Sequence, residues 1–443
     1  MPNVSISSPD LRRVGLSTSS VDKCSLVALS AFAYTLIIAP LLSYGTNTAS
    51  LGSSAASQIQ HIMTPRLENK LVWPMLAGIT VVLVLRNRSR VTLPPHIVSL
   101  FAYLALAGAS VLWAFKPELS LQRFVLLLLI VVSIVFPVTL AARTTDLIRG
   151  MFICFAFALI VNVFFILNQT PIIIDKIVKG YPGYFAFKGI LGECAAVAFL
   201  LSLHEMLYSG RRLALGISVA VVAICVMILS QSKGALGLAL LTPWLAGLSL
   251  IAGKMIRVSP AIVLLPIVFG YEVLSRLLGN LTGRISYYLY GNYTMSGRAN
   301  IWEFVHYESV RKPLFGWGYQ SFWFVGPDGP SVVDAPGWIK VMPSAHNGYL
   351  DTKLELGYVG LSILVIFIFA TLHAIGHVAG RDTRRAWLLL SLALFIILTN
   401  FVESSWMRGM DILWLTFLFV AAEIARYWPG GSARRFVVQQ QPS

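Results

Sequence analysis

The stretch "SAHNGYLDTKLELGYVGL" at residues 344–361 begins an apolar segment, yet its first twelve residues include four titratable ones, His346, Asp351, Lys353 and Glu355. If a helix begins here with Ser344 as its N-cap, His346 lies in the first turn, where the positive end of the helix dipole disfavours an imidazolium. A neutral imidazole can accept a proton, which makes His346 a candidate general base. The alternative is an interfacial histidine that simply faces water.

Helical spacing places several residues of this stretch on one face. These are His346, Leu350, Lys353, Gly357 and Gly360, which follow one another at steps of three or four. The two glycines predict that a neighbouring helix approaches closely. The polar residues above them would then line the mouth of a cavity.

A second candidate, Arg298, lies upstream in "YTMSGRANIWEFVHYESVRKPLFGWGYQSFW". Ser296 and Gly297 indicate the start of a helix, and Pro313 should end it. The apolar residues of this helix at helical spacing are Ile301, Phe304, Val305 and Val310. The pattern also fits an amphipathic helix that lies on a membrane surface, an interpretation that leaves Arg298 unexplained.

The composition defines the elements that must position these residues. The chain is 57% hydrophobic and only 12% charged, with mean hydropathy +0.75, which excludes a soluble globular protein. Runs long enough to cross ~30 Å of hydrocarbon lie at 24–44, 70–86, 96–115, 120–142, 146–168, 186–208, 213–231, 234–253, 258–275, 349–376, 386–403 and 409–427. We therefore predict an all-α integral membrane protein with about twelve transmembrane helices and one large loop between helices nine and ten.

Basic residues set the expected orientation, because cytoplasmic connections retain Lys and Arg during insertion. This rule predicts cytoplasmic tails at 1–23 and 428–443, transmembrane helices at 24–275 and 349–427, and a periplasmic loop at 276–348. The net charge of +15 then mostly reflects topology, and we expect no nucleic-acid partner. The first apolar run is too long for a cleavable signal peptide. All four cysteines lie in or beside apolar runs, which predicts neither a disulfide nor a metal site.

A transporter is the alternative from another class. A transporter of the major facilitator type should show two similar six-helix halves joined by a long link, but the corresponding link here is only about "YSGRR", and no repeat is apparent. Ionisable residues in a span usually mark a pathway or a buried pair, and Glu193, His204 and Glu205 are those that a transporter would use. Solvation at the cytoplasmic end is an adequate explanation for His204 and Glu205, while Glu193 could pair with Lys188.

Three ordered motifs carry a family resemblance. "HN" at 346–347 is followed after nine residues by "GYVG" at 357–360, and "TMSGRANIW" at 294–302 and "PLFGWGYQSFW" at 313–323 precede them. Together with the loop position, they resemble the O-antigen ligase and O-antigen polymerase superfamily. They look most like its exopolysaccharide polymerase branch, which is related to succinoglycan synthesis.

The resemblance implies an enzyme of the bacterial inner membrane that takes a glycan from undecaprenyl diphosphate and passes it to an acceptor hydroxyl. It implies that His346 is the essential loop histidine and general base, and that Arg298 binds the diphosphate. Lys188 in "FAFKGILGE" would be the second cation, although Phe187 and Gly189 depart from the family's "HKN.LG" string. Its alternative is an ordinary lysine that snorkels to the interface.

The chemistry fits these residue types. A lipid diphosphate leaves as an anion, so it needs cations to hold it, and the guanidinium fork matches phosphate oxygens. The scheme requires no metal and no cofactor. Arg284, beside "SYYLY", is a lesser candidate for the diphosphate and could equally contact phospholipid headgroups.

Two enzyme functions remain open. A polymerase of exopolysaccharide repeat units is favoured by the motifs at 294–323, and an O-antigen ligase that acts on the lipid A core shares the same fold and chemistry. The alternative from another class is a transporter of polysaccharide or lipid-linked sugars. The expected partners are undecaprenyl-diphosphate-linked oligosaccharide and membrane lipids, with a flippase and a chain-length regulator working beside the enzyme.

Overall fold

The computed structural model describes residues 23–50, 67–87, 91–141, 144–169, 172–174, 177–277, 283–284, 287–288, 291 and 297–431. The helices before the long loop are α1 (Lys23–Ala33), the π-helical turn η1 (Tyr34–Ile38), α2 (Ala39–Ser50), α4 (Leu67–Arg86), α5 (Pro95–Ala109), the 3-10 turn η3 (Ser110–Trp113), α6 (Pro117–Leu140), α7 (Thr144–Leu167), α8 (Lys188–Glu205), α9 (Arg211–Leu229), α10 (Lys233–Ile256) and α11 (Pro260–Leu277). The loop contains α13 (Arg298–Arg311), α14 (Pro330–Val333) and the 3-10 turn η4 (Gly337–Val341). It is followed by α15 (Gly348–Ala379), α16 (Thr383–Thr399) and α17 (Ile412–Ala425).

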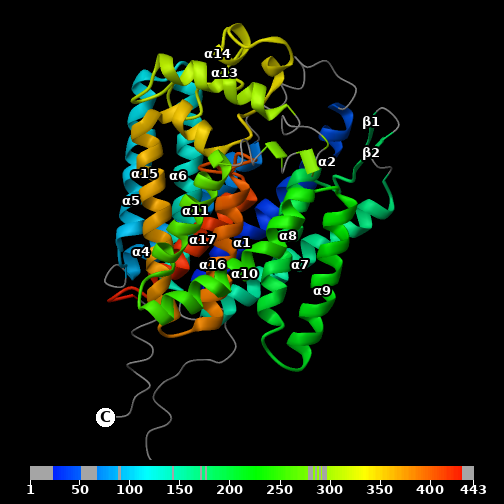
Figure 1. Cartoon of the computed structure of the whole chain (residues 1–443), viewed down its shortest axis with the longest axis vertical. Coiled ribbons are helices and arrows are strands. Elements are labelled where there is room, and N and C mark those ends of the chain that lie inside the picture. Colours follow the sequence, from blue (N-terminus) through cyan, green and yellow to red (C-terminus); the bar gives the residue numbers. More distant parts are fainter. Residues whose placement is uncertain are drawn as a thin grey trace, which may run out of the picture.

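Among the described residues, eight helical segments are long and apolar enough to cross a membrane, so the chain is a multi-pass membrane protein. Each of the twelve apolar runs in the sequence overlaps a described helix. Four of the described helices that overlap these runs fall outside the eight: α8, which carries three charges, α11, and the shorter α16 and α17 with 17 and 14 residues. Figure 1 shows the long helices packed in one bundle, with α13 and α14 at one end of it.

One short element departs from an all-helical fold. Strands β1 (Ile172–Ile174) and β2 (Ile177–Gly180) pair antiparallel in the connection between α7 and α8. Figure 1 places this hairpin at the edge of the bundle, where it adds no layer to the fold.

Helix α15 is interrupted at Gly357, whose φ of +67° and ψ of −164° are not helical. A Cβ on Gly357 would lie 2.1 Å from the carbonyl oxygen of Leu314, so only glycine allows the loop to approach this closely. The space therefore admits the segment 313–318, and not a neighbouring helix as the sequence predicted. The atoms nearest to a Cβ on Gly360 would be those of the Leu356 side chain in its own helix.

Segment 313–318 also satisfies the backbone groups that the interruption leaves without helical partners. The four hydrogen bonds run from Trp317 N to Leu354 O (3.0 Å), from Gly318 N to Glu355 O (2.8 Å), from Tyr358 N to Pro313 O (2.8 Å) and from Val359 N to Leu314 O (3.2 Å). They replace the two helical bonds that would join residues 354 and 355 to residues 358 and 359. A broken membrane helix is stable where buried protein re-satisfies its backbone, and the motif "PLFGWG" does this here.

The apolar face of α13 packs on the loop's own aromatic core. Its residues Ile301, Phe304 and Val305 are buried, and they join a cluster with Trp317, Phe322, Trp323, Ala335, Ile339, Ala345 and Leu354. The predicted apolar face is therefore covered by protein and not by a membrane surface. Val310 was wrongly assigned to it, since this side chain is exposed. The helix ends two residues before Pro313, and Ser296 lies outside the described residues.

Ionic pairs also close the opposite end of the bundle. Arg212 donates to both carboxylate oxygens of Glu205, at 2.7 and 2.6 Å. Both Glu205 and His204 are buried, so the expectation that solvent surrounds them is wrong. Arg426 contacts Glu423 at 3.0 Å and donates to the carbonyl of Ala141 at 2.7 Å. The four cysteines are all free thiols.

Candidate functional site

His346 precedes α15 and does not lie in its first turn. Asn347 is the N-cap, because its side-chain oxygen accepts hydrogen bonds from the amides of Tyr349 and Leu350, both at 3.1 Å. Ser344, the predicted cap, instead accepts a hydrogen bond from the amide of His346 at 3.3 Å. His346 itself adopts a φ of +47°, which is uncommon for a residue with a side chain. Because His346 lies outside the first turn, the helix dipole does little to disfavour its imidazolium. The contacts of the ring decide its environment instead.

The backbone on the C-terminal side of His346 is pinned to the connection between α16 and α17. The amide of Asn347 donates to Ser404 Oγ at 2.9 Å. The amide of Gly348 is shared between the carbonyls of Asn400 and Glu403, each at 2.9 Å. A left-handed conformation persists only where its surroundings over-determine it, and these bonds do so.

One carboxylate joins the two principal residues predicted from the sequence. Glu403 accepts a hydrogen bond from Arg298 Nη2 on Oε1 at 2.7 Å, and its Oε2 lies 3.1 Å from His346 Nδ1. Arg298 also donates through Nε to the carbonyl of Val402 at 3.0 Å. The structure thus brings His346 and Arg298 together, from segments 48 positions apart, through a residue that the sequence analysis did not select.

The contact with Glu403 fixes which ring nitrogen of His346 carries hydrogen. An ionised carboxylate can only accept, so Nδ1 must be protonated and donate to it. In the neutral ring, Nε2 then holds the lone pair and is available as a base. The side chains of His346, Arg298 and Glu403 are 29%, 18% and 34% exposed, so a substrate can reach all three.

Charge and hydrogen bonding keep Glu403 ionised. Burial raises the pKa of this carboxyl group, but the hydrogen bond from His346 and the charge of Arg298 together outweigh burial and leave the pKa below its ordinary value. The carboxylate is therefore negative at neutral pH and can stabilise a positive charge on the imidazole ring.

A second ionic cluster contains Asp351 and Glu355, the two acidic residues of the stretch 344–361. Arg408 Nη2 lies 3.0 Å from Asp351 and 3.1 Å from Glu355, and both carboxylates are almost completely buried. Asp351 also accepts from the amide of Ala345 at 3.0 Å and from the indole of Trp323 at 2.8 Å. Asp351 and Glu355 therefore hold the loop on the bundle and do not line an open cavity.

Arg123 on α6 extends this cluster to the loop backbone. Its guanidinium donates to the carbonyls of Gln320, Trp323 and Phe324. The hydroxyl of Tyr319 donates to the carbonyl of Met407 at 2.6 Å, which ties the same turn to the connection between α16 and α17. These bonds make the aromatic motif at 313–323 a structural anchor for the loop.

The other predicted cations are not joined to His346 by a described hydrogen bond or ion pair. Lys188 is the first residue of α8, and its carbonyl accepts a hydrogen bond from Ser232 Oγ at 3.2 Å. Arg284 is exposed and pairs with no described residue. Glu193 is buried within electrostatic reach of Glu403 and Asp411, which places α8 beside the site.

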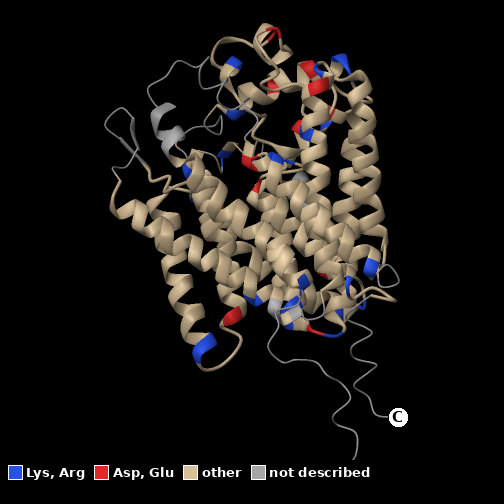
Figure 2. Cartoon of the chain, turned by 180° about the vertical axis from the view of Figure 1, so that it is seen from behind, with Lys and Arg blue, Asp and Glu red and all other residues tan. Residues whose placement is uncertain are grey.

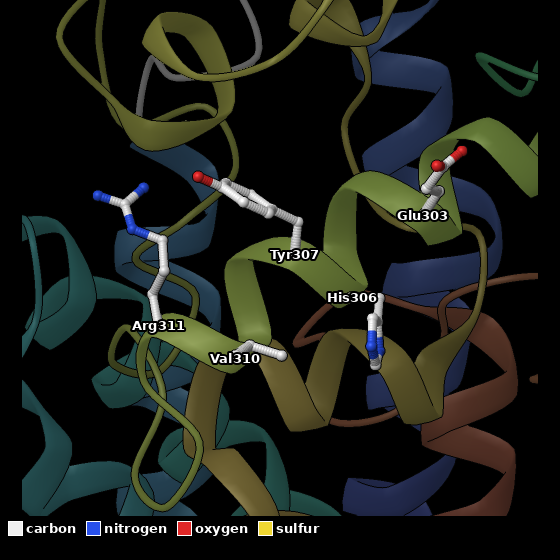
Figure 3. Close-up of a pocket in the computed structure, with 5 residues that line it drawn as sticks. All are labelled: Glu303, His306, Tyr307, Val310 and Arg311. Carbon is white, nitrogen blue, oxygen red and sulfur yellow. The ribbon is translucent and has the colours of Figure 1, made fainter.

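A surface hollow of about 440 Å³ lies along α13, and His346, Arg298 and Glu403 are not among its lining residues. It is lined by Glu303, His306, Tyr307, Val310 and Arg311. Figure 3 shows that all five side chains come from this one helix. Arg311 pairs with Glu308 at 3.0 Å and contacts Asp334 at 2.7 Å. Among the described residues, no group of three or more His, Cys, Asp and Glu side chains is arranged to hold a metal ion.

Sequence reasoning missed Glu403 because it was counted as the last residue of an apolar run, 386–403. The helix actually ends at Thr399, where Asn400 turns the chain and accepts hydrogen bonds from the amides of Ser405 and Trp406. The available signal was the cluster of polar residues in "NFVESSWMRGMD" at 400–411, between two apolar runs.

Known proteins match only part of this chain. No family model matches it. Over 128 residues the chain is 30% identical to a protein of Rickettsia bellii named "Putative polysaccharide ligase". The matched region covers 27% of this chain and 31% of that protein. Over 134 residues it is 28% identical to a protein of Rickettsia typhi with the same description, covering 29% and 33% of the two chains. The chain thus spans about a third of the length of the curated relatives it matches.

Proposed function

We propose that this chain is a polysaccharide polymerase of the bacterial inner membrane, which transfers a glycan from undecaprenyl diphosphate to a sugar hydroxyl. The observation that carries the proposal is the carboxylate of Glu403, which joins a candidate base, His346, to a candidate phosphate-binding cation, Arg298. The relatives named as polysaccharide ligases support the same class of substrate. The motifs at 294–323 favour the exopolysaccharide branch, and the polymer would be an exopolysaccharide or another surface polysaccharide.

The proposed topology has twelve crossings, cytoplasmic termini and a periplasmic loop at 276–348. It is supported by the overlap of all twelve apolar runs with described helices. Figure 2 shows Lys and Arg gathered at both ends of the bundle. In the proposed topology, those at one end lie in cytoplasmic connections, and those at the other end would bind an anion. The part of α15 after its interruption at Gly357, residues 358–379, would be about 33 Å long at 1.5 Å per residue, which is enough to cross ~30 Å of hydrocarbon and leaves the first turns of α15 outside it.

In the proposed reaction, the acceptor hydroxyl oxygen attacks the anomeric carbon of the donor glycan. The bond between that carbon and the phosphate oxygen breaks, and the electron pair leaves with undecaprenyl diphosphate. His346 Nε2 takes the proton of the acceptor hydroxyl, and Glu403 stabilises the resulting imidazolium through Nδ1–H. Arg298 holds the diphosphate, whose negative charge increases as the bond breaks. The proposal needs no metal and no cofactor.

Lys188 and Arg284 are proposed as secondary contacts for the diphosphate. Lys188 is favoured because it begins α8, the helix that carries Glu193 close to Glu403. A lysine would act there as a point charge, without the bidentate fork of arginine. Arg284 is exposed in the same loop as Arg298, and membrane phospholipid headgroups would compete for it.

The test is the length of the glycan left on undecaprenyl diphosphate, measured by mass spectrometry in cells whose only copy carries His346→Ala. Accumulated single repeat units support the polymerase. Accumulated long chains would identify the alternative, an O-antigen ligase that transfers O-antigen to the lipid A core. His306→Ala, which removes an exposed histidine of α13, is the matched control and should give normal polymer.

Normal product from the His346→Ala cells would contradict this mechanism. A transporter of polysaccharide or lipid-linked sugars, the alternative of another class, predicts a different result. Lipid-linked repeat units would then accumulate on the cytoplasmic face and remain inaccessible to an enzyme added from outside.

A further inference from the structure

Glu403 contacts both the residue proposed to bind the diphosphate and the residue proposed to act as the base, through one carboxylate oxygen each. Oε1 contacts Arg298, the cation assigned to the diphosphate, and Oε2 contacts His346, the assigned base. We infer that the diphosphate of the donor displaces Glu403 from Arg298, and that the released carboxylate then acts on His346 alone. Glu403 is thus a positioning residue that couples donor binding to the readiness of the base. This inference rests on the proposed function.

The geometry makes Glu403 and the diphosphate compete for the guanidinium of Arg298. Arg298 donates through Nη2 to Glu403 and through Nε to the carbonyl of Val402, so two of its donors are already engaged in the described structure. A diphosphate offers the guanidinium fork a more highly charged acceptor than one carboxylate. Nε and Nη2 form one edge of the guanidinium, and a diphosphate that binds this edge replaces the ionic contact with Glu403.

The charges around Glu403 explain why this replacement matters to His346. While Arg298 lies on Oε1, its positive charge offsets the carboxylate that faces the imidazole ring. When Arg298 turns to the diphosphate, the carboxylate keeps the hydrogen bond from the Nδ1–H of His346. Glu193, which is also acidic, lies within electrostatic reach of Glu403. An imidazolium is then better stabilised, which favours removal of a proton from the acceptor.

The exposure of the three side chains permits the exchange. Glu403 and His346 are each about one third exposed and Arg298 is partly exposed, so the contact can open without unfolding the loop. The loop is held separately by Arg408 and its two buried carboxylates, which do not contact Arg298. The switch therefore concerns side chains and leaves the backbone in place.

The critical measurement compares binding with turnover in Glu403→Gln. Glutamine keeps an oxygen that can accept from His346 Nδ1–H but removes the charge that occupies Arg298. We expect the purified full-length variant to bind undecaprenyl diphosphate, and inorganic pyrophosphate as a simpler probe, about tenfold more tightly than the natural chain. We expect its kcat to fall on the order of 100-fold, because the imidazolium loses its counter-charge. A residue that only maintained the fold would weaken both.

Two further variants test whether the effect is specific. Glu403→Asp keeps the charge, so it should show no tighter binding even if the geometry of the pair is disturbed. Asp334→Asn removes a carboxylate from Arg311 at the far end of the same helix and is the matched control. We expect it to bind pyrophosphate and undecaprenyl diphosphate as the natural chain does.

The outcomes separate this inference from the function on which it rests. If the natural chain binds undecaprenyl diphosphate and Arg298→Ala abolishes binding, but Glu403→Gln binds equally or less tightly, then the displacement of Glu403 is wrong and the proposed function stands. If the natural chain binds neither undecaprenyl diphosphate nor pyrophosphate, then both proposals fail. Tighter binding together with slower turnover in Glu403→Gln supports both.

Discussion

Two ionic clusters lie close together at the end of the bundle that carries the loop, and they differ in how deeply their carboxylates are buried. In one, Asp351 and Glu355 are almost fully buried around Arg408, and their oxygens also accept hydrogen bonds from the loop. In the other, Glu403 divides its oxygens between Arg298 and His346, and about a third of its surface is exposed. Burial of ion-paired groups indicates a structural cluster, whereas exposure lets a ligand reach the other one.

The comparison also answers why a membrane helix begins with so many titratable groups. Asp351 and Glu355 are needed to attach a loop that contains many aromatic residues to the bundle. His346 owes its position to that attachment, because the amide of the preceding residue, Ala345, donates to Asp351. The buried cluster of Arg408, Asp351 and Glu355 therefore holds His346 in position for the exposed cluster.

The largest effect should come from Arg408→Met, which breaks the buried cluster. Removing the cation leaves two carboxylates buried and unpaired, and we expect the free energy of unfolding to fall by about 3–5 kcal/mol. Chemical denaturation in detergent, followed by tryptophan fluorescence, measures the change. Adding Glu355→Gln to Arg408→Met should recover part of the loss, since one unpaired charge is then removed. A single variant as stable as the natural chain would show that the cluster is not structural.

A somewhat smaller loss is expected for Gly357→Ala, which disturbs the contact between the loop and α15. The added Cβ would meet the carbonyl oxygen of Leu314 at 2.1 Å and would require an unfavourable backbone conformation. We expect a loss of about 3 kcal/mol, together with reduced turnover because the loop shifts. The control is Gly376→Ala on the same helix, where the nearest atom is 3.9 Å away. It should be neutral or slightly stabilising, since alanine favours helix. Equal behaviour of the two variants would contradict the close approach.

The exposed cluster should respond differently, with a loss of turnover and little change in stability. Arg298→Lys keeps the positive charge but loses the guanidinium fork, so we expect turnover of lipid-linked glycan to fall about 10- to 100-fold. The unfolding midpoint should stay close to that of the natural chain. The measurement pairs a polymerisation assay with denaturation of the same preparation. Full activity of the lysine variant would contradict the assignment of Arg298 as the residue that binds the diphosphate.

Sequence reasoning succeeded where one short segment decides the outcome and failed where distant segments meet. The apolar runs predicted the helices, and "RANIWEFV" predicted α13, because periodicity is a local property. The pairing of His346 with Glu403 joins residues 57 positions apart, and no local pattern shows it. The end of α16 was placed too late for a related reason: apolar Phe401 and Val402 continue the run although Asn400 has already ended the helix.

The role of Gly357 shows the same limit in another form. Glycines at helical spacing predicted close approach of a partner, and the approach is real. The partner, however, is the backbone of 313–318 and not a helix, because the interruption of α15 exposes hydrogen-bonding groups that an extended segment can satisfy. Spacing alone could not show that Gly357 leaves the helical conformation.

The exposed cluster should make a small contribution to the free energy of unfolding, and this contribution should depend on pH. The pKa of Glu403 is below its ordinary value in the folded chain, so its pairing adds stability above the ordinary carboxylate range. That contribution is lost as the pH falls through the lowered value. We expect the natural chain to exceed Glu403→Gln in stability by about 1 kcal/mol or less at pH 7, since the group is a third exposed. Unfolding measured from pH 7 to 3 should show the difference disappear at the acid end. A difference that grew with acidity would reverse the assigned sign.

The smallest effect is expected for Asp334→Asn, which breaks an exposed pair in the same loop. Asp334 and Arg311 are 36% and 46% exposed, so water screens their contact although the distance is only 2.7 Å. Exposed pairs contribute about 0–1 kcal/mol, and Arg311 keeps its second partner, Glu308. We expect an unchanged unfolding midpoint and normal polymer length, measured as for Arg298→Lys. A loss comparable to that of Arg408→Met would mean that exposure does not separate the structural cluster from the others, and the contrast between the two ionic clusters would lose its physical basis.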